Sequence, residues 1–153
     1  MKTLKIKKFL FVLILGLVQL PGHADEMFLS GRCEAPFPES MLDLREYIEN
    51  KGYTISRVQR VDIGLKERGY KTGLYRVIFF GKNSEIQYIR KNHPGLIPYI
   101  PLSITVFENG EYTHISAVNP NTLQTLYDSE KIKSLLAAWS LDVLSIFKDY
   151  NEC

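Results

Sequence analysis

The strongest constraint on the fold of this chain is an Asn-Gly pair, Asn109-Gly110, between two segments of alternating apolar and polar residues, 102–107 and 112–118. Such a pair is typical of a β-hairpin closed by a two-residue type I′ turn. The register that this turn imposes pairs Phe107 with Tyr112, Thr105 with His114, and Ser103 with Ser116. One face of the hairpin then carries Leu102, Ile104, Val106, Thr113, Ile115 and Ala117, and the other carries Ser103, Thr105, Phe107, Tyr112, His114 and Ser116.

Two more strands and several helices are expected around this hairpin. Segments 53–61 and 74–80 are rich in β-branched and aromatic residues, and the near-continuous apolar run of the second predicts a central place in the sheet. Helices are expected at 38–51, at 62–69 with Asp62 as the N-cap, and at 84–92 with Ser84 as the N-cap. Three prolines between 93 and 101 predict a rigid, irregular loop there.

The C-terminal segment has the clearest helical period in the chain. Its apolar residues recur with the 3.6-residue spacing of one helix face: Ile132, Leu135, Leu136, Trp139, Val143, Ile146 and Phe147. Asp128 or Ser129 can cap this helix, and a shorter helical turn is expected around 122–127. Together the elements predict an α+β fold in two layers, with an antiparallel sheet of about four strands, helices on one face and a C-terminal helix.

The first 24 residues have the three parts of a secretory signal peptide. Four lysines precede residue 9, an apolar run follows from Phe9 to Leu20, and Gly22-His23-Ala24 provides small residues before the expected cleavage point. An uncleaved membrane anchor is the alternative, but this run as a helix would span only about 18 Å of a roughly 30 Å hydrocarbon core. We expect a mature chain with an extended arm at 25–37 and a single domain at 38–153.

Loss of the leader changes the partners that are expected. Without its four lysines the formal net charge falls from +2 to −2, which gives no electrostatic footprint for nucleic acid. No other segment approaches 18 consecutive apolar residues, so no membrane span is expected after cleavage. Export also favours a disulfide between the two cysteines, Cys33 and Cys153, which would close a loop of about 120 residues. Two free thiols or an intermolecular bond are the alternatives.

The central segments resemble a known family. The residues that carry the resemblance are Tyr75-Arg76-Val77-Ile78-Phe79-Phe80-Gly81, then Pro101-Leu102-Ser103-Ile104-Thr105-Val106-Phe107-Glu108, then Asn119-Pro120. Their order is similar to that of the family called domain of unknown function 302, over about residues 40–125. The resemblance implies helices on an antiparallel sheet and supplies neither an activity nor catalytic residues. With the small size of the chain, it favours the periplasm as the location, with the extracellular space as the alternative.

No catalytic, metal or cofactor motif is present, so functional residues are sought on the polar-aromatic face. Phe107 and Tyr112 would form an exposed aromatic patch if that face is uncovered, and His114 would lie beside Thr105. The simpler interpretations are a cross-strand pair that stabilises the hairpin and a solvated surface histidine. His93 before Pro94 is more simply part of a loop, and the turn at 80–84 lacks the glycines of a phosphate loop.

The hypothesis from the sequence is a non-enzymatic envelope protein that binds a partner, a second copy or a small ligand through Thr105, Phe107, Tyr112 and His114, or through the adjacent proline-rich loop. The alternative is an enzyme with an unfamiliar site around His114, Thr105 and Tyr112. A third hypothesis is a metal carrier that uses His93, His114 and a carboxylate. No cofactor is expected.

Overall fold

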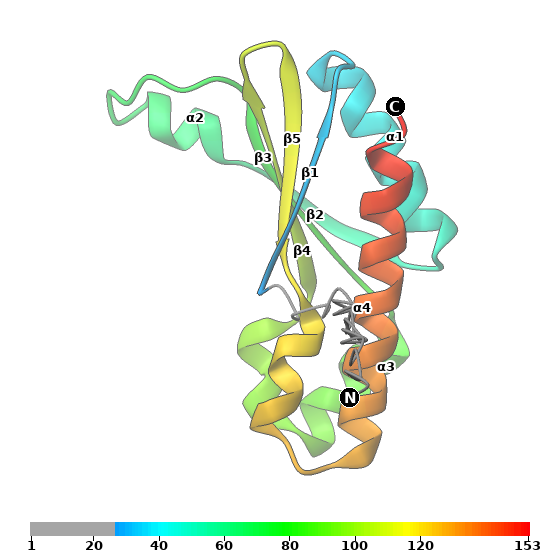
Figure 1. Ribbon diagram of the computed structural model, residues 1–153. Coiled ribbons are helices and arrows are strands. Elements are labelled where there is room, and N and C mark those ends of the chain that lie inside the picture. Colours follow the sequence, from blue (N-terminus) through cyan, green and yellow to red (C-terminus); the bar gives the residue numbers. More distant parts are fainter. Residues whose placement is uncertain (1–26) are drawn as a thin grey trace, which may run out of the picture.

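The computed structural model describes residues 27–153, so the predicted signal peptide lies outside the described residues. Five antiparallel strands form one sheet in the spatial order β1-β5-β4-β3-β2. The strands are β1 (Phe28–Cys33), β2 (Thr54–Arg60), β3 (Tyr75–Gly81), β4 (Leu102–Asn109) and β5 (Tyr112–Val118). Figure 1 shows the long, twisted sheet with the C-terminal helix running alongside it.

Helices cover one face of the sheet, as the sequence predicts. These are α1 (Phe37–Asn50), α3 (Asn83–Asn92) and α4 (Glu130–Tyr150), while the short α2 (Val61–Lys66) projects from the sheet (Figure 1). Two 3₁₀ helices, η1 (Pro94–Tyr99) and η2 (Pro120–Leu126), lie at the foot of the sheet. The proline-rich segment is therefore a 3₁₀ helix followed by a cis bond before Pro101, where an irregular loop was expected.

The core lies between the inner face of the sheet and helices α1, α3 and α4. Along β1, β3, β4 and β5, residues that point inward alternate with residues that do not, as the predicted hairpin faces require. The sheet contributes Leu29, Cys33, Ile78, Phe80, Ile104, Val106, Ile115 and Ala117, and the helices contribute mainly Leu44, Ile48, Ile89, Ile132, Leu136, Trp139, Val143, Ile146, Phe147 and Tyr150. The opposite, outer face of β4 and β5 carries half-exposed polar and aromatic side chains.

The sheet has one strand more than predicted. The extra strand, β1, comes from the segment that was expected to be an extended arm, and it pairs with β5 from Phe28–Val118 to Cys33–Thr113. Its sequence Phe-Leu-Ser-Gly-Arg-Cys is short and contains a glycine, so its own strand propensity is weak. The long hairpin provides the template that holds it, which is a tertiary effect.

The hairpin exists, but its predicted turn is wrong by one position. Asn109 pairs with Tyr112, so Gly110 and Glu111 form the loop, and Phe107 faces His114 while Thr105 faces Ser116. Gly110 has φ of +65° and no non-glycine residue between 27 and 153 has a positive φ, which matches a type II′ turn and excludes type I′. Phe107 thus pairs two residues further along β5 than predicted. Because side chains alternate between faces with a period of two, this even shift leaves every side chain on its predicted face.

Two of the predicted helix caps are also wrong. Asp62 lies inside α2, whose N-cap is Arg60, and its buried carboxylate pairs with Arg76 instead of capping the helix. Helix α3 begins at Asn83, one residue before Ser84, and no side chain caps it. At α4 the prediction is confirmed, since the Ser129 hydroxyl accepts the amide of Ile132.

The C-terminal residues of the chain meet the end of β1. Cys33, at the end of β1, and Cys153 lie at disulfide distance within one chain, with Cα atoms 5.6 Å apart. Within residues 27–153 the structure has no helix that is long and apolar enough to cross a membrane.

Candidate functional site

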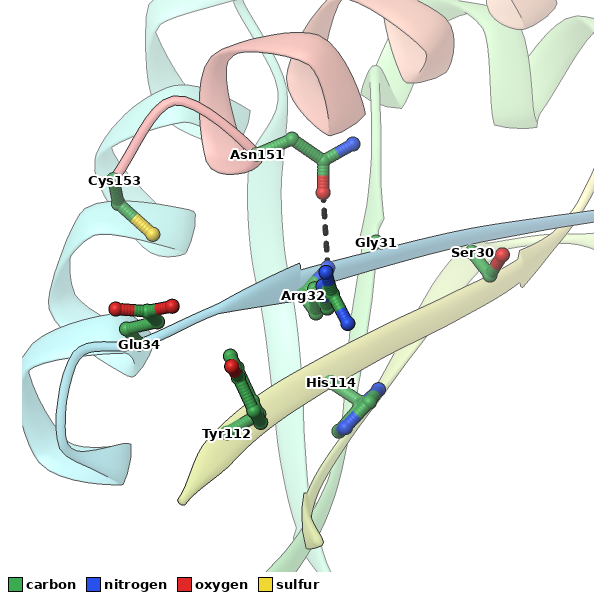
Figure 2. Close-up of a pocket in the computed structure, with 8 residues that line it drawn as sticks. All are labelled: Ser30, Gly31, Arg32, Glu34, Tyr112, His114, Asn151 and Cys153. Atoms are coloured by element: carbon green, nitrogen blue, oxygen red, sulfur yellow. Dashed lines mark hydrogen bonds between the residues drawn. The ribbon is translucent and has the colours of Figure 1, made fainter. Parts of the chain in front are cut away.

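A polar groove of about 510 Å³ opens where β1, β5 and the C-terminal residues meet. Figure 2 shows the side chains that line it, which come from three separate parts of the sequence. The lining residues are Ser30, Gly31, Arg32, Glu34, Tyr112, His114, Asn151 and Cys153. Two of the four site residues expected from the sequence, Tyr112 and His114, are among them.

Arg32 lies in the middle of this groove (Figure 2). Strand pairing sets Arg32 opposite His114, and its backbone amide points away from β5 and donates to Oδ1 of Asn151 at 2.9 Å. Its guanidinium carbon lies 5.0 Å from the centroid of the Tyr112 ring, within cation–π range. The ring thereby braces the long side chain over the outer face.

An aromatic cluster adjoins Arg32 on the outer face. The rings of Phe107 and His114 stack with centroids 5.4 Å apart and an interplanar angle of 15°. Tyr112 meets His114 edge to face at 6.2 Å. Thr105 shares this face but lies opposite Ser116, so the structure does not bring it into register with His114 as predicted.

The polar groups of the groove have few partners of their own. No oppositely charged group in residues 27–153 lies within 4.0 Å of the Arg32 guanidinium or the Glu34 carboxylate. In the same part of the chain, neither the Tyr112 hydroxyl nor the His114 ring has a hydrogen-bond partner. Solvated polar groups that converge on one concavity are free to bind a ligand.

The wall of the groove opposite β5 is built by the end of the chain. Asn151 reaches Arg32 past Gly31, where a Cβ atom would lie only 2.7 Å from Asn151 Oδ1 and 3.0 Å from Ile115 Cγ1. The absence of a side chain at residue 31 therefore permits this close approach. The pairing of Cys153 with Cys33 closes the wall beyond Asn151.

A second hollow, of about 280 Å³, is mainly apolar and lies at the foot of the sheet. It is lined by η1, the first residues of β4 and the end of β5, including Tyr99, Pro101, Leu102 and Val118. Its lining also includes Ser103, a residue of the predicted polar-aromatic face. It therefore offers shape and apolar contact, with little polar chemistry.

The other candidates from the sequence are engaged elsewhere. His93 lies near Tyr88, with its Nε2 3.2 Å from the tyrosine hydroxyl, and it does not line the polar groove. Lys82, in the turn before α3, pairs with Asp142 at 3.2 Å and covers the Tyr53 ring at 4.4 Å, so its charge is already balanced. Within the described residues, no group of three His, Cys, Asp or Glu side chains is placed to hold a metal ion.

Besides Gly31, four groove residues were not found from the sequence. Ser30, Arg32 and Glu34 belong to the segment predicted as an arm, and Asn151 follows the last helix. The alternation of Leu29, Gly31 and Cys33 with Ser30 and Arg32 is a weak strand pattern that could have indicated which side chains face outward. No local pattern indicates that Asn151 returns to β1.

Comparison with known proteins gives the family. A sequence model described as "Domain of unknown function DUF302" matches residues 30–144. The crystal structure of an uncharacterized conserved DUF302 protein from Bacillus stearothermophilus superposes with a TM-score of 0.72 and 14% identity, covering 81% of this chain and 98% of that one. No curated protein matches the chain. At that identity the structural likeness shows a shared fold, and the sequence match shows that the chain belongs to the DUF302 family.

Proposed function

We propose that this protein is an exported, non-enzymatic binding protein of the bacterial cell envelope that holds a small polar ligand in the groove between β1, β5 and the C-terminus. One observation carries the proposal. Arg32, Tyr112 and His114 converge on one concavity, and within the described chain their guanidinium, hydroxyl and ring nitrogens have no hydrogen-bond or ion-pair partner. Ligand sites combine such polar groups with an apolar surface, which the rings of Tyr112 and His114 supply here, and Phe107 stacks on His114 without lining the groove.

Export is supported by two independent features. The lysine-led apolar leader has the form of a cleavable signal peptide, and the cysteine pair favours an oxidising compartment. Expression of the full chain in a Gram-negative host, followed by fractionation and intact mass measurement, tests this. We expect a periplasmic product that begins at Asp25; a cytoplasmic product that begins at Met1 would contradict it.

Binding is favoured over catalysis by the surroundings of His114. A catalytic histidine is normally oriented by a carboxylate or carbonyl on one ring nitrogen and faces a nucleophile on the other. Here the ring is held by stacking on Phe107, and no described residue hydrogen-bonds to it. Thr105, the hydroxyl that the enzyme hypothesis needs, lies opposite Ser116.

The direct test is amide NMR of the mature protein with a library of small polar compounds. We expect a subset of compounds to shift the amides of β1, the start of β5 and residue 151. The double variant Arg32→Ala/Tyr112→Ala should lose these shifts, whereas the control Arg57→Ala, an exposed arginine on β2 at the other sheet edge, should keep them. Absence of any compound that shifts the groove amides would overturn the proposal.

The same spectra distinguish a protein partner from a small ligand. If the outer face mediates self-association, the amides around Phe107 will shift with protein concentration alone, and Phe107→Ala/Tyr112→Ala will abolish that shift. Such a result, without compound binding in the groove, would replace the small ligand by a second copy of the chain.

A further inference from the structure

We infer that the ligand of the polar groove is a zwitterion of the α-amino acid type, whose carboxylate binds Arg32 and whose ammonium group binds Glu34. The inference rests on the proposed function and names the chemical class that the groove selects. It follows from the charges that line the groove, from their lack of partners, and from the uncharged surface between them.

The two charges of the groove are opposite in sign and unpaired. Arg32 in β1 and Glu34, directly after that strand, line one concavity, yet neither has an oppositely charged partner within 4.0 Å among residues 27–153. In Figure 2 the Glu34 carboxylate lies to the left of Tyr112, whereas Arg32 and His114 lie to its right. The two side chains do not pair with each other, so both charges are open to a ligand.

This charge pattern discriminates against simpler ligands. A carboxylate alone would bind Arg32 but would also lie in the field of Glu34, and an ammonium ion alone would be repelled by Arg32. A ligand with both groups on neighbouring atoms satisfies both side chains and leaves the groove neutral. The guanidinium fork matches a carboxylate in two parallel hydrogen bonds, and this gives the ligand its orientation.

The uncharged lining accounts for the rest of such a ligand. The faces and edges of Tyr112 and His114, with Phe107 behind His114, form an aromatic surface next to the charged pair. An aromatic or large aliphatic side chain of the ligand can pack there. A volume of about 510 Å³ accommodates a molecule of this size with bridging water.

The test compares L-phenylalanine with two derivatives that each lack one charge, phenylalaninamide and N-acetylphenylalanine, using calorimetry and amide NMR on the mature protein. Phenylalanine should shift the groove amides and bind about tenfold or more tightly than either derivative, as expected for one lost charged hydrogen bond. Glu34→Gln should abolish the preference for phenylalanine over N-acetylphenylalanine. Arg32→Gln should abolish the preference for phenylalanine over phenylalaninamide.

Matched controls separate binding from folding. Both substitutions are at exposed residues, and Arg57→Gln removes an equal charge at the far edge of the sheet and should leave all three affinities unchanged. Unchanged ligand preferences in Arg32→Gln and Glu34→Gln would overturn the inference. So would a groove that binds library compounds but not millimolar phenylalanine, a result that leaves the proposed function intact. A groove that binds nothing would overturn both.

Discussion

Asp62 of α2 and Arg76 of β3 form a buried ion pair at the point where the projecting segment around α2 joins the sheet. Both residues are at most 9% exposed, Arg76 also donates to the carbonyl of Tyr75, and its guanidinium carbon lies 5.7 Å from the Phe37 ring centroid. The pair therefore ties α2 to the sheet and to the first turn of α1.

Removal of one member of this pair should destabilise the protein strongly. Asp62→Asn leaves the Arg76 guanidinium buried without its counter-charge, for which the expected cost is about 3–5 kcal/mol. Urea unfolding followed by circular dichroism measures it. The double variant Asp62→Leu/Arg76→Met removes both charges and should be more stable than Asp62→Asn; if it is less stable, desolvation is not the dominant cost.

The cysteine pair should contribute to stability through the unfolded state. A link across 120 residues restricts the unfolded chain by up to about 4–5 kcal/mol in the chain-entropy model, and often by less. We expect a reductant to lower the urea midpoint of the wild type to that of Cys33→Ala/Cys153→Ala. The reductant should not affect the double variant, and an unchanged wild-type midpoint would show that the two sulfurs are not joined in solution.

A methyl group at residue 31 should disturb the groove wall. Gly31→Ala places its Cβ against Asn151 Oδ1 and Ile115 Cγ1, and overpacking of this kind costs about 1–3 kcal/mol. Part of this cost should disappear in the Asn151→Ala background, which a double-mutant cycle measures. Gly64→Ala in α2 is the matched control, because nothing lies within 4 Å of its added Cβ. Equal costs of Gly31→Ala in both backgrounds would contradict the close approach.

Alkaline pH should destabilise the fold through Tyr53. Burial, and then the hydrogen bond from its hydroxyl to Asp142 Oδ2 at 2.8 Å, raise the pKa of Tyr53 above its usual value of 10.0. Above pH 10 the unfolded chain loses this proton while the folded chain keeps it, so the free energy of unfolding falls as the pH rises. Below pH 10 both states keep the proton, and the group adds no pH dependence.

Urea unfolding at a series of pH values tests this effect. From pH 9 to pH 11.5, Tyr53→Phe should lose less stability than the wild type. A residual decline should remain because burial also raises the pKa of Tyr150, whose hydroxyl donates to the carbonyl of Thr113. Equal declines in the two proteins would show that Tyr53 titrates normally in the folded state.

The sequence predicted those parts of the fold whose information is local. Alternation placed each residue of the hairpin on its correct face, because a side-chain period of two survives a shift of the turn by one position. The 3.6-residue period and the Ser129 cap located α4 because both are features of a single continuous segment. Strand β1 was missed because it is stabilised by pairing with β5, and the role of Asp62 was missed because its partner Arg76 is remote in sequence.

The sequence predicted two of the eight residues that line the candidate site. Tyr112 and His114 follow from the hairpin pattern, whereas Arg32 and Glu34 enter the groove only through the pairing of β1. Asn151 enters through tertiary packing that returns the end of α4 to β1. Lone charged residues in an irregular segment have no local pattern that indicates which cavity they will line.

The boundary of the family match gives the groove wall a particular significance. The match ends at residue 144, before Asn151 and Cys153, which close one side of the groove. Changes to this short tail can alter what the groove admits without touching any residue of the common sheet. In the proposed ligand site, selectivity therefore depends in part on residues outside the family match, and exchange of the last few residues offers a route to alter that selectivity while keeping the sheet.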